Sequence, residues 1–360
     1  MPKRHFQTFD ALRFFAFLKV FLLHLPITAF PVFNFLKAGG GIGVQFFFML
    51  SGFLITYIIY EEKQRQGYLN LKKFYARRLL RIWPLYYLAV VFAYLTPLLV
   101  SALGFQVSDE GYTPDPWFSF TFLENYKMIL TRDHPNVAPL TVLWSLCIEE
   151  HFYLVWGILL YFVKLKRLPW VIFGAIIIAN TSRIIFIANG IPTIEILTNI
   201  DLFAYGAIPA YLLLHYPERF DKFIPAITFW LKFLFGILLL AAVLLFPHYK
   251  APYSEIISTA ILGILFSILV CLIIPVKTNF RIAENNIFSR LGIFTFGLYV
   301  FHTVVIGVLN LVFKKLSFSL ELPFYAFLFS LLALGITIIV SMLSYYFFEK
   351  PFLQLKKYFY

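Results

Sequence analysis

The sequence predicts an all-α, polytopic integral membrane protein, and three observations lead to this prediction. Of the 360 residues, 61% are hydrophobic and only 13% are charged, whereas a soluble domain carries about 25% charged residues. The apolar residues are gathered in continuous runs of about 20, the length that a helix needs to cross a bilayer. These runs lack the alternation of apolar and polar residues that is typical of barrel strands. We therefore expect one transmembrane domain over residues 1–360, with no appended soluble domain.

About ten membrane-spanning helices are expected, and they share an almost uninterrupted apolar composition. The expected spans are Phe9–Phe30, Ile42–Tyr60, Leu79–Val100, Leu140–Val163, Leu168–Ile187, Leu197–Leu214, Ile227–Phe246, Ile256–Ile274, Phe288–Phe313 and Leu322–Phe348. No small-residue cleavage site follows the first run, so we interpret it as a retained helix and not as a signal peptide.

The distribution of positive charge indicates the orientation of the spans. The formal net charge is +12. If the N-terminus is cytoplasmic and the spans alternate, 20 of the 30 lysines and arginines lie in inside segments or at the cytoplasmic ends of spans, and 6 lie in outside segments. This bias follows the positive-inside rule and predicts that both termini are cytoplasmic. Because topology explains most of the charge, we expect the lipid bilayer, and not nucleic acid, to be a partner.

The first span contains an arginine and a histidine, Arg13 and His24, among Phe, Leu, Ala and Val residues. An ionisable side chain inside a membrane helix costs roughly 2.5–3.5 kcal/mol, so such residues usually have a function. Eleven positions correspond to about three helical turns, which places both side chains on one face, about 16 Å apart along the axis. Taken alone, the arginine could extend its charge to the membrane surface, and the histidine could bond a neighbouring helix. Together they favour a line of polar contacts that leads into the membrane.

Three arginines lie at the cytoplasmic start of the third span: Arg77 and Arg78 just before it and Arg81 in its first turn. Their spacings of three and four residues place them on one side of a helix. The planar fork of an arginine binds phosphate through two hydrogen bonds. Anchoring to lipid head groups is the alternative, and the sequence favours both equally.

The fourth and ninth spans carry the other costly polar residues. Ser145, Glu149 and Tyr153 are spaced by four and therefore share a helix face. Two adjacent carboxylates, Glu149 and Glu150, are expensive to bury, so a function is expected here. Tyr299 and His302 are three residues apart near the middle of the ninth span.

Together, these motifs resemble those of the acyltransferase-3 family of membrane O-acyltransferases. The matching segments are Arg13-x10-His24, the block Gly43–Leu54, Arg78-x-x-Arg81, Trp144-Ser-Leu-x-x-Glu149, Asp201–Gly206, Leu291-Gly through Tyr299-x-x-His302, and Tyr345-x-Phe-x-Glu349-Lys-Pro. They follow one another from one end of the chain to the other, so the resemblance covers nearly all of it. It is specific to the family and not to a substrate.

The resemblance implies a single acyltransferase domain in the bacterial inner membrane. The enzyme would move an acyl group, commonly acetyl, from cytoplasmic acyl-CoA to a hydroxyl of an extracytoplasmic glycan or glycolipid. Acyl-CoA would be a donor substrate, and we expect no permanently bound cofactor and no metal ion. Small-molecule acceptors such as macrolides are an alternative within the family. A transporter or flippase of glycan precursors is an alternative outside it, since ten spans and charges within the membrane suit that function too.

The expected chemistry assigns a role to each of these residues. An alcohol that attacks a thioester needs a base, and histidine suits this task near neutral pH. We predict that His24 is this base or carries the acyl group covalently, with Glu149 or Glu150 orienting it. Arg13 would steer the donor toward His24. The CoA phosphates are assigned to Arg78 and Arg81 with Arg77, and substrate binding is assigned to Ser145, Tyr153, Tyr299 and His302.

Overall fold

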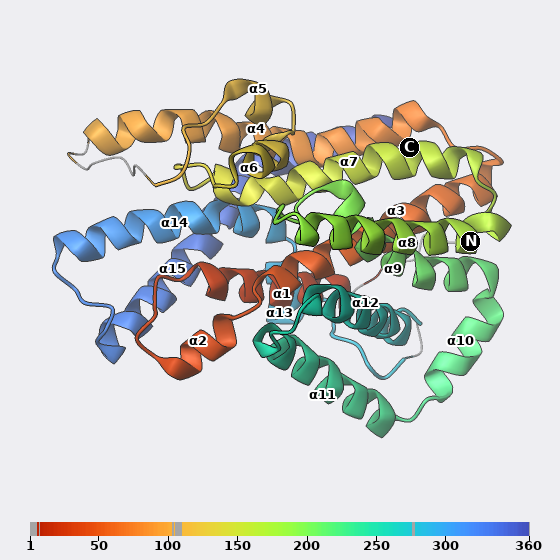
Figure 1. Ribbon diagram of the computed structural model, residues 1–360. Helices are drawn as coiled ribbons and strands as arrows, with labels where there is room; N and C mark the ends of the chain where they lie inside the picture. Colours follow the sequence, from red (N-terminus) through yellow and green to blue (C-terminus); the bar gives the residue numbers. More distant parts are fainter. Residues whose placement is uncertain (1–5, 7, 103, 105–109, 276–277, 360) are drawn as a thin grey trace. The chain divides into compact units, whose positions relative to one another are not determined.

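Helices form the protein in the part of the chain that the computed structural model describes, residues 6, 8–102, 104, 110–275 and 278–359 (Figure 1). Each predicted span contains a helix. These helices are α1 (Thr8–His24), α3 (Gly41–Gln66), α4 (Leu71–Ala102), α7 (Leu140–Phe162), α8 (Leu168–Ala188), α9 (Ile196–His215), α11 (Phe229–Leu245), α12 (Ser254–Ile273), α14 (Thr295–Lys315) and α15 (Pro323–Ser344). Nine stretches of the described residues, one for every span except the first, are long and apolar enough to cross a membrane. The protein is therefore an all-α, polytopic membrane protein, as predicted.

Shorter helical elements connect or follow these helices. They are α2 (Pro31–Lys37), α5 (Pro116–Phe120), α6 (Glu124–Thr131), η1 (Leu165–Arg167), α10 (Pro217–Ala226), η2 (Phe246–His248), α13 (Ile287–Gly292), η3 (Tyr345–Glu349), α16 (Lys350–Gln354) and η4 (Leu355–Phe359). Within the expected first span, α1 ends at His24 although the apolar run continues to Phe30. Pro26 explains the early end, because a proline disfavours the helical conformation of the residue before it.

The described residues form two compact units, each assembled from separate stretches of sequence. Unit 1 contains those within Met1–Leu23, Phe35–Leu69 and His151–Ile293. Unit 2 contains those within His24–Asn34, Asn70–Glu150 and Phe294–Tyr360. The division falls within three helices: the last residue of α1 belongs to unit 2, α2 is divided after Asn34, and α7 is divided after Glu150.

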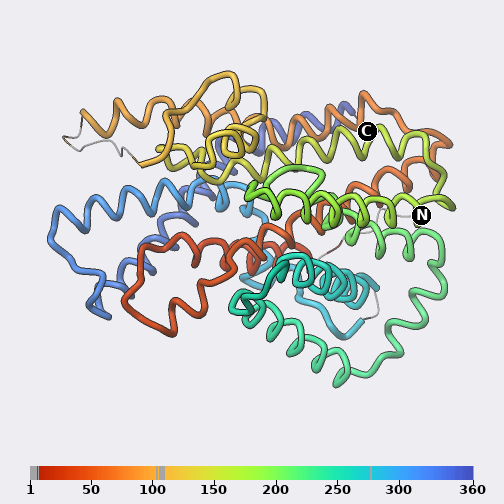
Figure 2. The backbone as a smooth tube through the Cα atoms, in the orientation of Figure 1, coloured from red at the N-terminus to blue at the C-terminus, as the bar shows by residue number. Residues whose placement is uncertain are grey.

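In unit 1, α9 is the central helix. It packs along α3, and α8 and α12 also lie against it (Figure 2). A Cβ atom at Gly52 of α3 would overlap the backbone of Phe203, and one at Gly206 of α9 would overlap the carbonyl oxygen of Met49. The two glycines therefore allow the backbones to approach closely, which is typical of membrane helix pairs.

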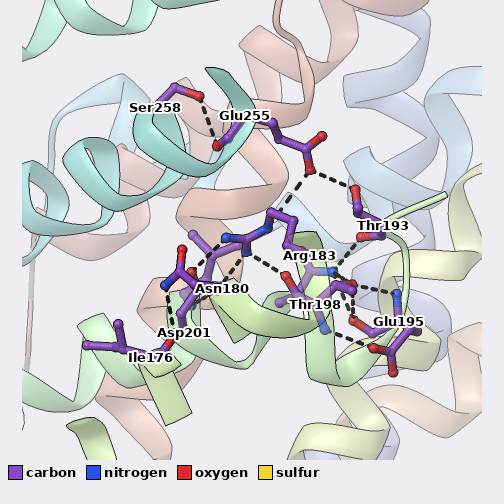
Figure 3. A network of polar contacts seen from close by, with 11 residues as sticks. Ile176, Asn180, Arg183, Thr193, Glu195, Thr198, Asp201, Glu255 and Ser258 are labelled. Carbon is purple, nitrogen blue, oxygen red and sulfur yellow. Dashed lines mark hydrogen bonds and ion pairs between the residues drawn. The ribbon is translucent and has the colours of Figure 1, made fainter. Parts of the chain in front are cut away.

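A buried ion pair joins α8 to α9 in unit 1 (Figure 3). Two guanidinium nitrogens of Arg183 donate to the two carboxylate oxygens of Asp201, at 2.9 and 3.1 Å. The same guanidinium donates to the carbonyl oxygen of Thr198, and the side chains of Arg183 and Asp201 are 2% and 0% exposed. Glu195 caps the start of α9 by accepting from the Thr198 amide at 2.9 Å. This cluster has opposite charges in direct contact, so we interpret it as structural.

In unit 2, α14 packs against α15, and the C-terminal elements η3, α16 and η4 lie against α4. The turn η3 is π-helical. This geometry is rare in proteins, and where it occurs it is often at a functional site. It buries Glu349, which the sequence places at the end of the last span. The chain after the last span therefore folds back onto the helix that carries the three arginines.

A connection formed by α5 and α6 is fixed to unit 2 through the buried side chain of Glu124. Ser119 and Tyr112 each donate a hydroxyl to the carboxyl group of Glu124 at 2.6 Å. The hydroxyl of Tyr86 on α4 donates to the Ser119 carbonyl at 2.7 Å. Burial raises the pKa of Glu124, and the hydrogen bonds from Ser119 and Tyr112 partly oppose this increase.

Candidate active site

His24 and His302 form a pair in unit 2. Nδ1 of His24 lies 3.2 Å from Nε2 of His302, and the two rings meet edge to face with centroids 4.9 Å apart. His302 lies near the middle of α14 and is completely buried, whereas His24 is half-buried at the end of α1. The structure thus brings together two histidines that are 278 positions apart in the sequence.

The partners of the two rings define where their protons lie. Nδ1 of His302 is 2.7 Å from the carbonyl oxygen of Tyr299. A carbonyl only accepts, so this Nδ1 carries the hydrogen and Nε2 of the neutral ring is an acceptor. Nδ1 of His24 must then donate to it, which leaves the lone pair of His24 on Nε2. The geometry therefore prepares His24 Nε2 to accept a proton or to attack a carbonyl carbon.

Ser145 and Tyr299 meet beside this pair, as members of the facing helices α7 and α14. Their hydroxyl oxygens are 2.7 Å apart, and Tyr299 also donates to the Val142 carbonyl at 3.2 Å. Both side chains are buried. Glu149, which shares a helix face with Ser145, lies within electrostatic range of Tyr299. Tyr299 thus connects α7 to the histidine pair: its hydroxyl bonds α7, and its carbonyl oxygen bonds His302.

The second glutamate of α7, Glu150, has a different partner. It is buried, and Oε2 accepts from Nε1 of Trp83 on α4 at 3.3 Å. Adjacent residues of a helix point about 100° apart, which explains why the two carboxylates face different neighbours. Nδ1 of His24 is bonded to His302. That Glu149 or Glu150 orients the histidine stays a prediction.

A cluster of cations lies where the C-terminal elements meet α4. Lys356 of η4 is within electrostatic range of Arg77, Arg78 and Arg81. Arg77 is buried and donates to the carbonyl oxygen of Phe359 at 2.6 Å. The guanidinium of Arg78 lies 5.8 Å from the ring centre of Phe74. Three arginines and a lysine that interact electrostatically favour a ligand with several negative charges, such as a polyphosphate.

Two predicted site residues, Arg13 and Tyr153, belong to unit 1. Arg13 forms an ion pair with Asp10 one turn earlier on α1, at 2.6 Å. The hydroxyl of Tyr153 donates to Oγ of Ser51 at 3.4 Å. Arg13 shares α1 with His24, as the sequence predicts.

A cleft of about 420 Å3 opens in unit 2. Pro26 and Thr28, which follow His24 closely in the chain, line one side of it. Asn310 and Lys314 of α14 line another side, and Glu321 completes its polar lining. Asn310 lies eight residues after His302, about 12 Å along the helix axis. The cleft therefore lies toward the end of α14 that follows the histidine.

Sequence reasoning missed Trp83, Lys356 and the cleft. In the sequence, Lys356 is one of several positive charges after the last span, and no spacing connects it to the arginines. Trp83 lies between Arg81 and Pro84, within one of the motifs. It does not stand out, because tryptophans are common near membrane surfaces. Among the described residues, no group of three or more His, Cys, Asp or Glu could hold a metal ion.

Comparison with known proteins identifies relatives along the whole chain. The model of the acyltransferase-3 family, described as "Acyltransferase domain", matches residues 6–346. The chain is 26% identical over 370 residues to the peptidoglycan O-acetyltransferase OatA of Listeria monocytogenes serovar 1/2a, and the match covers 97% of this chain and 56% of OatA. It is 35% identical over 164 residues to "Putative peptidoglycan O-acetyltransferase YrhL" of Bacillus subtilis (strain 168), covering 44% of this chain and 24% of that protein.

A further relative is "Putative O-acetyltransferase SACOL0978" of Staphylococcus aureus (strain COL), which is 26% identical over 372 residues, or 97% of this chain and 57% of its own length. The chain spans about half the length of the relatives that it matches from end to end. No solved structure matches it significantly. The names of these relatives all include O-acetyltransferase, which supports the enzyme class expected from the motifs. Since the family model covers nearly all of the sequence, the chain belongs to the acyltransferase-3 family.

Proposed function

We propose that the protein is a membrane O-acetyltransferase that moves an acetyl group from cytoplasmic acetyl-CoA to a hydroxyl of peptidoglycan outside the membrane. The observation that carries this proposal is the His24–His302 pair, which leaves the lone pair of His24 on Nε2. The acceptor is suggested by the names of OatA and YrhL, both of which refer to peptidoglycan. The inner membrane location and the cytoplasmic termini rest on the positive-inside bias of the sequence.

In the first of two chemical routes, His24 acts as a general base. The acceptor hydroxyl attacks the thioester carbonyl while its proton passes to Nε2 of His24. The C–S bond then breaks, and the departing CoA thiolate takes this proton. During the step, the imidazolium of His24 is stabilised by its Nδ1–H bond to His302. The products are the O-acetyl ester and CoA.

In the second route, His24 carries the acetyl group. Nε2 attacks the thioester carbonyl, the C–S bond breaks, and CoA leaves as the thiolate. The acceptor hydroxyl then attacks the acetyl carbon, the C–N bond breaks, and the hydroxyl proton is released to water, which has already protonated the departed CoA thiolate. The route suits a transfer across a membrane, because the donor and the acceptor need not be present together.

The two substrates would approach the histidine from opposite sides. Arg77, Arg78, Arg81 and Lys356 would hold the phosphates of the donor at the cytoplasmic side. The cleft beside Asn310 and Lys314 would receive the glycan, since α14 runs outward in the proposed orientation. Half of the lining residues of this cleft are polar, so they offer hydrogen-bond partners for the hydroxyl groups of a sugar.

Transfer by the purified protein in liposomes tests the proposed function. Acetyl-CoA labelled in the acetyl group is supplied on one side, and an N-acetylglucosamine–N-acetylmuramic acid disaccharide on the other. We expect alkali-labile label on the disaccharide only when both are present on the correct sides. A protein that moves the sugar but leaves acetyl-CoA intact would instead be a transporter.

Isotope exchange separates the two chemical routes. Labelled CoA is incubated with unlabelled acetyl-CoA and the protein, without acceptor. The acyl-carrier route predicts exchange of label into acetyl-CoA, whereas the general-base route predicts none.

A further inference from the structure

One carboxyl oxygen in unit 2 has no explanation in the fold. Oε1 of Glu150 is buried and has no hydrogen-bond partner among the described residues, while Oε2 is bonded to Trp83. The whole residue is only 7% exposed. Native proteins satisfy nearly all buried polar atoms, because a buried polar atom without a partner has lost its hydrogen bonds to water and gained none in return. An atom of this kind points to a ligand that completes its bonding.

The position of Glu150 is fixed by two contacts between α4 and α7. Trp83 contacts Glu150, and Tyr86, one turn later on α4, contacts Cys147, one turn earlier on α7. The two helices therefore run in opposite directions at this level. Residue numbers that increase along α4 from Arg78 therefore lie beside residue numbers that decrease along α7, from Glu150 to Ser145.

This order places Glu150 between the two ends of the proposed donor site. Arg78 and Arg81 precede Trp83 on α4, on the side of the cation cluster. Ser145 lies five residues before Glu150 on α7, about 7.5 Å along the axis, and it bonds Tyr299 beside the histidine pair. A donor whose phosphates contact the arginines and whose thioester reaches His24 must pass this level.

We propose that Oε1 of Glu150 binds an amide group in the pantetheine arm of the acyl-CoA donor. The inference rests on the proposed function and adds a specific donor contact to it. The arm joins the phosphates to the thioester and contains two amides. An amide offers both an N–H and a carbonyl oxygen, so it matches the carboxyl group whether that group is ionised or protonated. Trp83, which is 36% exposed, provides the accessible side of this contact.

A series of three donors tests this assignment. Acetyl-CoA has the phosphates and the arm, acetyl-pantetheine has the arm alone, and S-acetyl ethanethiol has neither. For Glu150→Leu, which has a similar volume and no polar atoms, we expect the KM of the first two donors to rise about tenfold. The KM of S-acetyl ethanethiol and all three kcat values should stay within about twofold of wild type.

Matched variants separate the contact from other effects. Arg78→Ala should raise the KM of acetyl-CoA and leave that of acetyl-pantetheine unchanged. Glu195→Gln, at a buried glutamate of unit 1, should change no KM. Glu150→Gln retains an amide that can bond the arm, so it should raise the KM of acetyl-pantetheine by no more than about threefold. If Glu150→Leu does not fold, Glu150→Ala replaces it with the same expectation, and an equal KM change for all three donors would then overturn the assignment.

Two results for Glu150→Leu would overturn the proposal. One is an equal rise of KM for all three donors, which would mean that the arm is not recognised. The other is a lower kcat at unchanged KM, which would place Glu150 in the chemical step. If the wild-type protein transfers acetyl from none of the donors, the proposed function fails and not this contact alone.

Discussion

Arg183 in unit 1 and His302 in unit 2 are both buried ionisable side chains of membrane helices, but their partners differ. Arg183 faces the carboxylate of Asp201 and a backbone carbonyl, so opposite charges meet directly. His302 faces a second imidazole, that of His24. Nδ1 of His302 bonds the carbonyl oxygen of Tyr299, which cannot change its protonation, whereas Nε2 bonds the His24 ring, which can. The first arrangement fixes every charge, whereas the second holds a proton that can be moved. We therefore interpret the first cluster as structural, and we propose that the second serves the chemistry.

Removing the reacting histidine should have the largest effect. We expect His24→Ala to lower the rate of acetyl transfer by about a thousandfold, because general-base catalysis alone contributes roughly 10²–10⁴. The melting temperature should change little, since His24 is half-buried at a helix end. Transfer is measured as alkali-labile acetyl on the acceptor, with Arg65→Ala at an exposed position of α3 as the control. Retained transfer at the wild-type rate would remove His24 from the mechanism.

Breaking the ion pair of unit 1 should affect stability instead. Asp201→Ala leaves the Arg183 charge buried without its carboxylate, and such a loss costs about 3–5 kcal/mol in the free energy of unfolding. Denaturant unfolding in detergent measures this value. The double variant Arg183→Met with Asp201→Leu should recover most of the stability, since no charge remains buried. A stable Asp201→Ala variant with impaired transfer would show that this cluster takes part in the chemistry.

Changing the partner of His24 should have an intermediate effect on the rate. His302→Phe removes the acceptor of the His24 Nδ1–H, so the ring loses its preferred tautomer and orientation. We expect transfer to fall about 100-fold, less than for His24→Ala. His302→Gln keeps an oxygen that accepts this hydrogen and should recover at least about tenfold. Equal losses in both variants would indicate a packing role for His302.

The smallest expected effect concerns pH and the connection formed by α5 and α6. Burial raises the pKa of Glu124, so the folded state binds its proton more tightly than the unfolded state does. Its contribution to stability is therefore complete below the unfolded value and is lost as pH rises through the folded value. The variant Glu124→Gln cannot ionise. Its melting temperature should therefore exceed that of wild type by a margin that grows as pH rises from the unfolded to the folded pKa of Glu124. A difference in melting temperature that does not vary with pH would contradict the assignment.

The sequence predicts the helices of this protein better than its contacts. Continuous apolar runs identify all ten helices, because membrane length limits the choice. The end of α1 at His24 depends on Pro26, which is visible in the sequence. The break between α13 and α14 is less visible. It follows Gly292, where a Cβ atom would overlap the backbone of Asp10, a contact between distant parts of unit 1.

The candidate site could be predicted only where its residues share a helix. Arg13 and His24 are on one helix, so their spacing alone relates them. The contact of His24 with His302 and that of Lys356 with the arginines depend on how helices pack. The expected carboxylate partner of the histidine illustrates the difficulty, since two neighbouring glutamates point in different directions and the sequence does not tell which neighbour each one meets.

A double-variant cycle on the histidine pair tests the central claim most directly. The rate of acetyl transfer is measured for wild type, His24→Ala, His302→Phe and the variant with both changes. If His302 acts only through His24, the double variant should transfer at the rate of His24→Ala alone, within about twofold. If the two losses multiply, His302 acts independently of His24, and the pair is not the catalytic unit that we propose.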